Sequence, residues 1–291
     1  MYHMRENNNN NDKRIINTEK IKSAVYNLLL DIMVNIDANT VRLLEKAYKN
    51  EKCQTAKFTL KTILDNDKLA KTDNIAFCQD TGLAVVFLEI GQDVALEGEY
   101  IENAVNQGVR EAYKDGYFRK SVVDPLTRQN TKDNTPAIIH TKIVEGSSVK
   151  VNVSAKGFGS ENMSMLFMLP PQSSKGDIIA KVVECVKTAG AKPCPPIVIG
   201  VGIGGTMEKA SLIAKYALTR DTATPSKCKD IATLEQEMLM AVNKLNIGVH
   251  GFGGDCTALA VHIETYPTHI AGLPLAVNIN CFATRHGSIL L

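Results

Sequence analysis

Three cysteines of this chain lie in segments that could serve a metal centre. Cys78 opens the run Cys-Gln-Asp-Thr-Gly, Cys194 lies between prolines, and Cys281 ends a predicted strand shortly before an arginine and a histidine. Prolines fix the backbone and remove competing N–H donors, and the polar neighbours could hold a small anion. An iron–sulfur cluster with only three cysteine ligands can act as a Lewis acid instead of an electron carrier. The shared context suggests a metal centre with one open position, although a single cysteine taken alone is more often a structural thiol.

The other four of the seven cysteines have less suggestive surroundings. Cys185 falls on the apolar face of a predicted helix and is expected in the core, whereas Cys53 and Cys228 lie in polar stretches. Cys256, beside Gly-Gly-Asp, is the candidate for a fourth ligand. No Cys-x-x-Cys pair occurs, which argues against zinc ribbons, thioredoxin-like sites and ferredoxin-type clusters. Any metal site must therefore be assembled from distant parts of the chain.

A glycine run at residues 200–205, Gly-Val-Gly-Ile-Gly-Gly, matches G-x-G-x-x-G. It follows a predicted strand and opens a predicted helix, so dinucleotide binding must be weighed, with Asp221 as the candidate ribose ligand. However, a polar loop at 220–230 stands where a dinucleotide fold needs its second strand. We interpret the run as a tight turn or as a helix N-terminus that faces an anion.

Two further polar segments could bind a ligand. Residues 156–164, Lys-Gly-Phe-Gly-Ser-Glu-Asn-Met-Ser, could bring backbone N–H groups close to a ligand, or could be a strand-to-helix turn capped by Ser160. The loop from Arg119 to Pro136 contains a second arginine, Arg128, and the planar fork of arginine suits a carboxylate. Arginines in long polar loops are nevertheless more often solvated than functional.

Three histidines lie in or beside predicted strands. His269 occupies a polar loop between two of them, twelve residues before Cys281, and usually such a histidine is a hydrogen-bonded structural group. His140 and His262 alternate with apolar neighbours, so we interpret both as structural.

Hydrophobic periodicity predicts the elements that must position these residues. We expect helices over 18–36, 40–50, 55–70, 101–113, 177–188, 206–219 and 234–245, and strands over 83–90, 137–144, 149–155, 197–200, 257–264 and 273–280. The sequence Glu-Gly-Ser-Ser between the second and third strands indicates a hairpin. The predicted class is α/β in the broad sense (α+β), with a helical N-terminal part followed by mixed β-sheets with flanking helices. Residues 1–17, with their Asn run, are predicted to be a disordered polar tail, and residues 18–291 a single domain, since no linker divides them.

The composition excludes several classes of protein. Hydrophobic residues make up 44% and charged residues 22%, as in a soluble globular protein. The net charge of +2 gives no electrostatic reason to expect nucleic acid or an anionic membrane as partner. No apolar run approaches the roughly 20 residues that span a bilayer, and the start of the chain lacks the apolar centre of a secretory signal. We therefore expect a cytoplasmic protein whose cysteines are thiols.

Taken together, these segments resemble the α subunit of the two-subunit iron–sulfur class I fumarate hydratases, a family that also contains the α subunit of L-tartrate dehydratase. The resemblance runs from about residue 18 to residue 291. It rests on the Cys78 run, Asn-Thr-x-Asp-Asn-Thr-Pro at 130–136, Lys-Gly-x-Gly-Ser-Glu-Asn-Met-Ser at 156–164, the Cys194 segment with its glycine run, and Pro-Thr-His-Ile-Ala-Gly-Leu-Pro at 267–274 leading to Cys281. Five motifs in the same order are far more specific than any one of them.

The resemblance implies a [4Fe–4S] cluster held by Cys78, Cys194 and Cys281, with the fourth iron free for substrate. It also implies a dicarboxylate pocket in which Asp80 and His269 are catalytic, and whose substrate-binding residues are Gln79, Arg119, Gly157 and Gly159. Removing a proton next to a carboxylate builds charge on that carboxylate, which a cationic iron, an arginine and N–H donors would stabilise. Because no redox change is needed, NAD is unnecessary.

The expected activity is the reversible hydration of fumarate to L-malate, which Ser-Glu-Asn-Met-Ser at 160–164 and Pro-Thr-His at 267–269 favour. The alternative within the family is the dehydration of L-tartrate. The chain ends ten residues after Cys281, whereas single-chain members continue into a second domain, so we expect a β subunit that supplies further substrate-binding and acid/base groups. An alternative of another class is a non-catalytic iron–sulfur redox or sensor protein, for which Cys256 would complete the ligand set.

Overall fold

The computed structural model describes residues 13–291, which divide into two compact units. The first unit comprises the residues up to Leu29, residues 84–153 and residues 287–291, and the second comprises residues 30–83 and 154–286. The chain passes between the units within α1 (Thr18–Val34), β2 (Leu83–Gly91), β5 (Val149–Lys156) and β10 (His286–Leu290). Because the crossings lie inside regular elements, no linker composition marks them, and the sequence therefore predicts one domain.

The predicted tail at residues 1–17 lies largely outside the described residues. Arg14–Asn17, however, form strand β1, which pairs in parallel with β3 (Val94–Glu97). Arg14 Nη1 donates hydrogen bonds to the carbonyls of Ser147 and Leu291 at 3.1 and 3.0 Å. The prediction of disorder is therefore wrong for residues 14–17. A strand of four residues is too short to leave a periodic signal.

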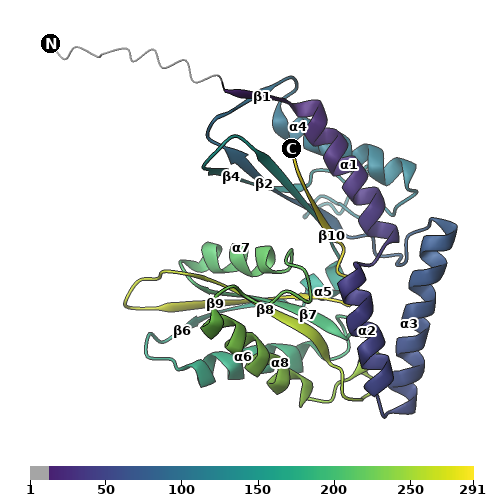
Figure 1. Cartoon of the computed structure of the whole chain (residues 1–291), viewed down its shortest axis with the longest axis vertical. Coiled ribbons are helices and arrows are strands. Elements are labelled where there is room, and N and C mark those ends of the chain that lie inside the picture. The colour runs from purple at the N-terminus through teal and green to yellow at the C-terminus, as the bar shows by residue number, and fades with distance from the viewer. Residues whose placement is uncertain (1–12) are drawn as a thin grey trace. The chain divides into compact units, whose positions relative to one another are not determined.

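The first unit contains a four-stranded sheet in the order β10-β5-β2-β4, where β4 is Ile138–Val144 and β10 is His286–Leu290 (Figure 1). Helix α4 (Ile101–Asp115) buries Val105, Val109 and Tyr113 and ends at Gly116, as predicted. Gly108 lets this helix approach α1 closely, since a Cβ there would stand 2.6 Å from the carbonyl oxygen of Lys22.

Strands β4 and β5 exist as predicted, but they do not form the predicted hairpin. Strand β2 lies between them and pairs in parallel with β4. The turn after β4 wraps around the end of β2, where Gly91 N donates to Ser148 O at 2.8 Å and Asp93 N donates to Gly146 O at 3.0 Å. The turn residues signal a reversal of the chain but not which strand lies between its two arms.

The second unit is built on a four-stranded sheet in the order β6-β9-β7-β8, comprising Met165–Leu169, Leu273–Asn280, Ile197–Gly204 and Ala258–Tyr266. Strands β7 and β8 are parallel, whereas β9 is antiparallel to both β6 and β7. The predicted α/β class with mixed sheets is thus confirmed.

Helices cover both faces of this sheet (Figure 1). Helices α6 (Lys175–Ala189) and α8 (Lys229–Asn243) bury Val182, Cys185 and Met238 against one face, which confirms Cys185 as a core residue. Helix α7 (Met207–Ala217) packs its alanines on the other face. The pair α2 (Ala38–Asn50) and α3 (Gln54–Asp73), the single turn α5 (Phe158–Glu161) and the short 3-10 helix η1 (Val249–Gly251) complete the unit.

The glycine run at 200–205 has a packing role. Gly200 and Gly202 lie inside β7, where a Cβ would collide with the carbonyls of Ala214 and Ala210 in α7. They allow the helix to lie directly on the strand, and only Gly204 and Gly205, with φ of +92° and +70°, form the turn. The predicted strand is therefore four residues too short at its end, and the first two glycines do not belong to a turn or a phosphate cradle.

This packing yields a stability prediction. Gly202→Ala is expected to lower the free energy of unfolding by about 1–3 kcal/mol, because the added methyl group pushes α7 off the sheet. The shift of the urea midpoint at unchanged m-value measures it. Gly272→Ala is the matched control, because nothing lies within 4 Å of its Cβ position. An equal midpoint shift in both variants would contradict the packing role of Gly202.

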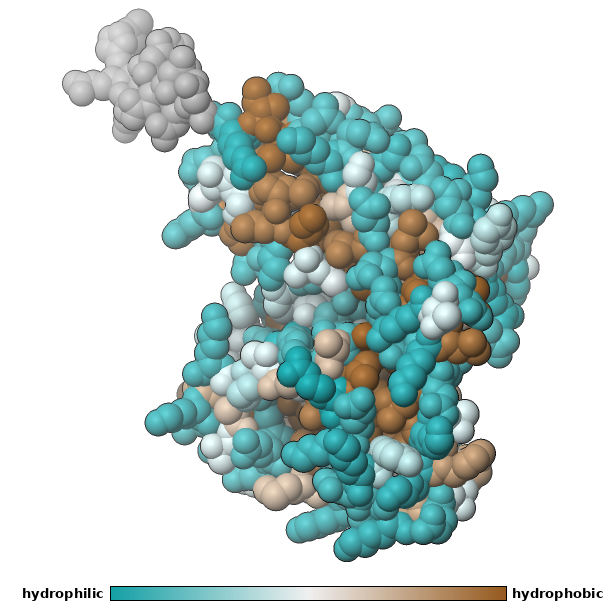
Figure 2. Space-filling view, turned by 45° about the vertical axis from the view of Figure 1, so that its right-hand side comes forward, coloured by the Kyte–Doolittle hydropathy of each residue, from teal (hydrophilic) through white to brown (hydrophobic). Residues whose placement is uncertain are grey.

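Within residues 13–291, none of the helices combines the length and apolar composition needed to cross a lipid bilayer. Hydrophilic side chains cover much of the face shown in Figure 2, between smaller apolar patches.

Candidate active site

The cysteines Cys78, Cys194 and Cys281 come together at one end of the sheet in the second unit. Cys194 precedes β7 and Cys281 directly follows β9, and the antiparallel pairing of Val198 with Asn280 places both at the same sheet end. Cys78 and Cys281 both pack against the small apolar cluster that contains Phe77.

The thiols are close enough to influence one another electrostatically. Burial raises the pKa of Cys194, and the neighbouring Cys281, Cys78 and Asp80 raise it further. Burial also raises the pKa of Cys281, which the positive charges of Arg285 and Lys156 oppose. The structure thus gathers three thiols from three distant segments beside two cationic side chains.

Cys194 has a distinctive backbone. Its φ is +53°, and its N–H donates to the carbonyl of Ala191 at 3.1 Å. Positive φ at a residue with a side chain costs on the order of 1 kcal/mol or more and is concentrated at functional sites. Cys194 is exposed as a residue while its thiol group is only partly buried, so the sulfur can still meet an incoming group.

The chemistry of the three thiols is that of iron–sulfur ligands, which are cysteine thiolates. Within the described part of the chain, no three His, Cys, Asp or Glu side chains are grouped to hold one ion. In a cluster each thiolate binds a different iron, so its ligands stand further apart than those of a single ion. Three thiols that come from separate segments, with two cationic groups beside Cys281, are the kind of ligand set that such a cluster would need.

Cys256 has a different environment. It packs with Leu44 and Leu60 in a separate apolar cluster. Burial, then Glu51 and Asp255, raise its pKa to about 12. Such surroundings favour the protonated thiol, whereas a metal ligand must be a thiolate.

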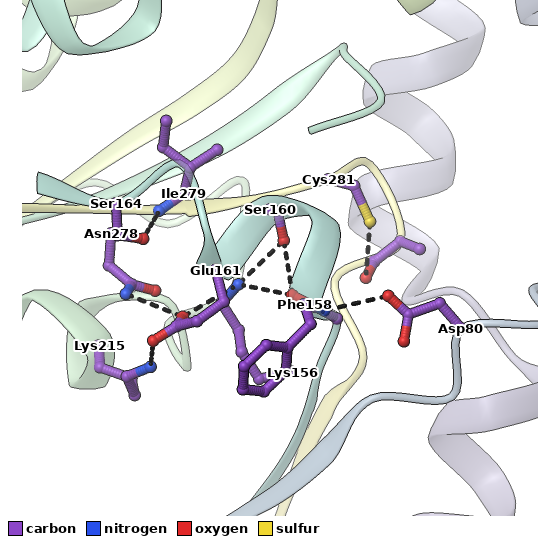
Figure 3. A network of polar contacts seen from close by, with 12 residues as sticks. Asp80, Lys156, Phe158, Ser160, Glu161, Ser164, Lys215, Asn278, Ile279 and Cys281 are labelled. Atoms are coloured by element: carbon purple, nitrogen blue, oxygen red, sulfur yellow. Dashed lines mark hydrogen bonds and ion pairs between the residues drawn. The ribbon is translucent and has the colours of Figure 1, made fainter. Parts of the chain in front are cut away.

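The carboxylate of Asp80 is fixed beside the cysteines. Its Oδ2 accepts a hydrogen bond from Phe158 N at 3.0 Å (Figure 3). Its Oδ1 accepts one from Gly82 N, also at 3.0 Å. Gly82 has φ +71°, and a Cβ there would stand 2.6 Å from the carbonyl oxygen of Lys156. Only glycine therefore lets the Cys78 run lie against this segment, which explains the last residue of the Cys-Gln-Asp-Thr-Gly motif.

The two predicted backbone-binding glycines lie at this site. A Cβ on Gly157 would be 3.0 Å from Arg285 Nη2 and 3.2 Å from Asp80 Oδ2, and one on Gly159 would be 3.7 Å from the carbonyl oxygen of Lys192. Gly157 therefore borders Asp80, and Gly159 borders the segment that leads to Cys194. Gln79 is exposed next to Asp80.

The turn that contains these glycines rests on a buried ionic network that sequence reasoning missed (Figure 3). Lys156 is 2% exposed; its Nζ donates to Ser160 Oγ at 2.9 Å and to Gly157 O at 3.2 Å, and lies 3.3 Å from Glu161 Oε2. Glu161 also pairs with Lys215 and accepts from Asn278 Nδ2 at 3.1 Å.

The network fixes the charges of its members. Burial lowers the pKa of Lys156 to about 8, and Glu161 only partly offsets this. Burial opposes ionisation of Glu161, yet Lys156 and Lys215 outweigh it and lower the pKa of the carboxyl. The ion pair between Lys156 and Glu161 holds α5 in place, and the first N–H group of α5, that of Phe158, donates to the Asp80 carboxylate. Ser160 lies inside this turn and donates to Gly157 O, so it is not the helix cap that one interpretation predicts.

Arg119 belongs to the first unit and is exposed there, so its role as a substrate ligand stays a prediction. The Asn-Thr-x-Asp-Asn-Thr-Pro motif of the same unit holds the segment that directly follows Arg119 by hydrogen bonds. Buried Asn134 accepts hydrogen bonds from Ser121 N and Val122 N at 2.7 and 3.2 Å, and Asn130 Nδ2 donates to Lys120 O at 3.0 Å. This motif therefore shapes the loop.

His269 lies at the opposite end of β9 from Cys281. The strand between them spans about 24 Å at the usual rise per residue. Thr268 Oγ1 donates to Gly205 O at 2.9 Å, which places this loop beside the far end of β7. The chain does not bring its own His269 to its own cysteines, and the catalytic role implied by resemblance remains a prediction.

His262 is structural, as predicted. It is buried, and its Nδ1 must carry a proton because it lies 3.1 Å from a carbonyl, that of Ala217. Burial, then the charge of Arg220, lower its pKa to about 4. His140 stacks on Phe87 with ring centroids 5.1 Å apart.

A pH dependence follows from His262. The unfolded chain binds a proton near pH 6.5 and the folded chain only near pH 4, so the free energy of unfolding falls as the pH drops through this window. The loss attributable to His262 is about 3 kcal/mol. Urea titrations at several pH values should show it in the wild type, and a His262→Gln variant should lack that part of the slope. Identical slopes in the two proteins would contradict a neutral buried imidazole.

The chain belongs to the Fumarate hydratase (Fumerase) family, a family of hydro-lyases, whose model matches residues 22–290. A putative L(+)-tartrate dehydratase subunit alpha of Methanocaldococcus jannaschii is 41% identical over 272 residues, which cover 91% of this chain and 95% of that protein. The L(+)-tartrate dehydratase subunit alpha of Escherichia coli strain K12 is 27% identical over 286 residues, 94% of each chain. The predicted family is confirmed, whereas the names of these relatives agree with the tartrate alternative better than with fumarate.

Proposed function

We propose that the chain is the α subunit of an iron–sulfur hydro-lyase that removes water from a four-carbon hydroxy diacid. The observation that carries the proposal is the convergence of the Cys78, Cys194 and Cys281 thiols beside the Asp80 carboxylate. When bound, a [4Fe–4S] cluster with three thiolate ligands would supply a Lewis acid for the substrate hydroxyl.

Asp80 is the proposed acid/base group. Two backbone N–H groups fix its carboxylate, so it meets the substrate in one orientation. A positioned carboxylate can take the proton from the carbon next to a substrate carboxylate and return it in the reverse reaction. Gly157 has no side chain, so its backbone can lie close to Asp80. We propose Gln79, Gly159 and Arg119 as substrate-binding residues, as the family resemblance implies.

L(+)-tartrate is the first candidate substrate, because the relatives are named L(+)-tartrate dehydratase subunit alpha. Fumarate is the second, because the matching family is described as fumarate hydratase. The residues of segment 160–164, whose sequence favours fumarate, have structural roles and therefore say little about the substrate. Ser160 and Glu161 belong to the network beneath α5, and Ser164 Oγ accepts a hydrogen bond from Ile279 N at 3.3 Å.

A β subunit is the proposed partner, since the relatives carry the designation "subunit alpha". It would contribute the remaining substrate-binding and acid/base groups. A cytoplasmic location is proposed with it, because thiol ligands persist in a reducing compartment.

The test is anaerobic co-purification with a candidate β chain, followed by reconstitution with iron and sulfide. Initial rates of L(+)-tartrate dehydration and fumarate hydration are measured on one preparation, with and without nicotinamide cofactors. We expect one diacid to be preferred by about 100-fold or more in kcat/KM, and nicotinamides to have no effect. A loaded complex that turns over neither diacid would contradict the hydro-lyase proposal and favour a redox or sensor protein. Full activity of the α chain alone would contradict the proposal that a β subunit is required.

A further inference from the structure

Arg285 occupies an unusual position for a buried arginine. It is 3% exposed and lies four residues after Cys281. Its backbone is fixed by hydrogen bonds, since Ala155 N donates to Arg285 O and Arg285 N donates to Ala283 O, both at 2.9 Å. The side chain of Arg285 therefore extends into the candidate site from a backbone that is held in place by these hydrogen bonds.

The guanidinium joins the segments that carry the candidate site. Its Nη1 donates to the backbone carbonyl of Asp80, and Nη2 lies 3.0 Å from the position that a Cβ on Gly157 would occupy. Its Cζ lies 6.0 Å from the ring centre of Phe77, next to Cys78. One side chain thus contacts the Cys78–Asp80 run and the Gly157 turn while standing on the Cys281 segment.

Part of this cation is left without a partner. The Nε–H group is buried and has no hydrogen-bond acceptor. The hydrogen bond to Asp80 goes to its backbone carbonyl and not to its carboxylate. A buried cation needs a compensating anion, and Cys281, which lies close enough to interact electrostatically with Arg285, becomes anionic when it ligates metal.

We propose that Arg285 is a positioning residue for the proposed reaction, which holds Asp80 against the Gly157 turn from inside the site. The inference rests on the proposed function, but its first test does not, because the hydrogen bonds that Asp80 accepts exist in the chain without its cofactor. If Arg285 holds the Asp80 backbone, its removal must loosen the bonds from Gly82 N and Phe158 N to the carboxylate.

The first experiment measures amide hydrogen exchange in the chain without cofactor. In Arg285→Met, the exchange protection of Gly82 and Phe158 should fall about tenfold, the usual effect of losing a charge-assisted hydrogen bond. Arg285→Lys should lose less of this exchange protection, because an ammonium group can still donate to the Asp80 carbonyl. It lacks the second NH₂ group that arginine places beside Gly157, so some protection should still be lost. Arg42→Met, at an exposed residue of α2, is the matched control and should leave both amides protected. Exchange at Val201, in the middle of β7, reports whether the variants remain globally folded.

The second experiment uses the loaded complex with its β chain. Arg285→Met should lower kcat per bound cluster by about 10- to 100-fold and change KM by less than about threefold, with partial rescue in Arg285→Lys. A purely structural role would reduce the folded fraction and leave kcat per cluster unchanged. If Arg285→Met does not fold, Gly157→Ala tests the same contact from the other side, because its methyl group would separate Asp80 from Arg285.

Unchanged protection at Gly82 and Phe158 in a folded Arg285→Met chain, or in Gly157→Ala, would overturn the proposal. So would a kcat per cluster within about twofold of wild type. A wild-type complex that turns over neither diacid would defeat the proposed function alone, and the exchange result would still decide whether Arg285 positions Asp80.

Discussion

Cys194→Ser is expected to abolish cluster binding and to lower kcat/KM by about 10³-fold or more. A Lewis-acidic metal contributes several kcal/mol to such a reaction, and each 1.36 kcal/mol is a factor of ten in rate. The same result is expected for Cys78→Ser and Cys281→Ser, because all three thiols converge on one site. Iron and sulfide counts after anaerobic reconstitution, together with initial rates, measure the effect.

Two cysteine controls make this prediction specific. Cys228→Ser, at an exposed residue before α8, should retain both iron and activity. Cys256→Ser should also retain the cluster, since this thiol packs in a separate apolar cluster. Loss of iron in Cys256→Ser would instead indicate a fully ligated cluster and support the non-catalytic alternative.

Asp80→Asn should lower kcat by about 10²- to 10⁴-fold while the cluster still loads, since general acid–base catalysis contributes an effect of this size. The amide oxygen of asparagine can accept one backbone hydrogen bond, but its NH₂ group cannot accept the other or take a proton. The measurement is kcat per bound cluster, compared with Asp73→Asn at an exposed residue of α3, which should behave as wild type. Normal turnover by a cluster-loaded Asp80→Asn complex would remove Asp80 from the acid/base role.

Long elements with strong periodicity were predictable from the sequence. Helices α2, α3, α4 and α6 and strands β2, β8 and β9 lie where hydrophobic spacing and, for α4 and α6, terminal glycines place them. Helix α8 exists as predicted but begins at Lys229 and ends at Asn243, before the predicted end at residue 245. The short strands β1, β3, β6 and β10 leave no such signal and were not predicted. The false hairpin has a different cause, because local turn residues cannot show that β2 enters between β4 and β5.

The candidate site was predictable where composition is unusual. The Cys78 run and the Cys194 and Cys281 segments stand out by their neighbours, and the glycines at 157 and 159 by their spacing. The burial of Lys156, Glu161 and Arg285 could not be found in this way, because a charged residue carries no sign of burial in its sequence context. Only the fold shows that each is enclosed and partnered at the site.

His269 illustrates the opposite error. Twelve residues from Cys281 is close in the sequence, but most of the separation is an extended strand, so the two residues lie at opposite sheet ends. The glycine run was misplaced for a related reason. Its spacing resembles a phosphate-binding turn, yet Gly200 and Gly202 are small because α7 lies directly on β7.

The most direct test of the three-thiol centre is a Mössbauer spectrum of the ⁵⁷Fe-reconstituted complex, recorded before and after addition of L(+)-tartrate or fumarate. Three cysteine ligands predict a cluster with one iron that differs from the rest and that alone changes its signal when the diacid binds. A cluster whose irons all stay unchanged by either diacid, or an active complex that contains no cluster iron, would contradict it.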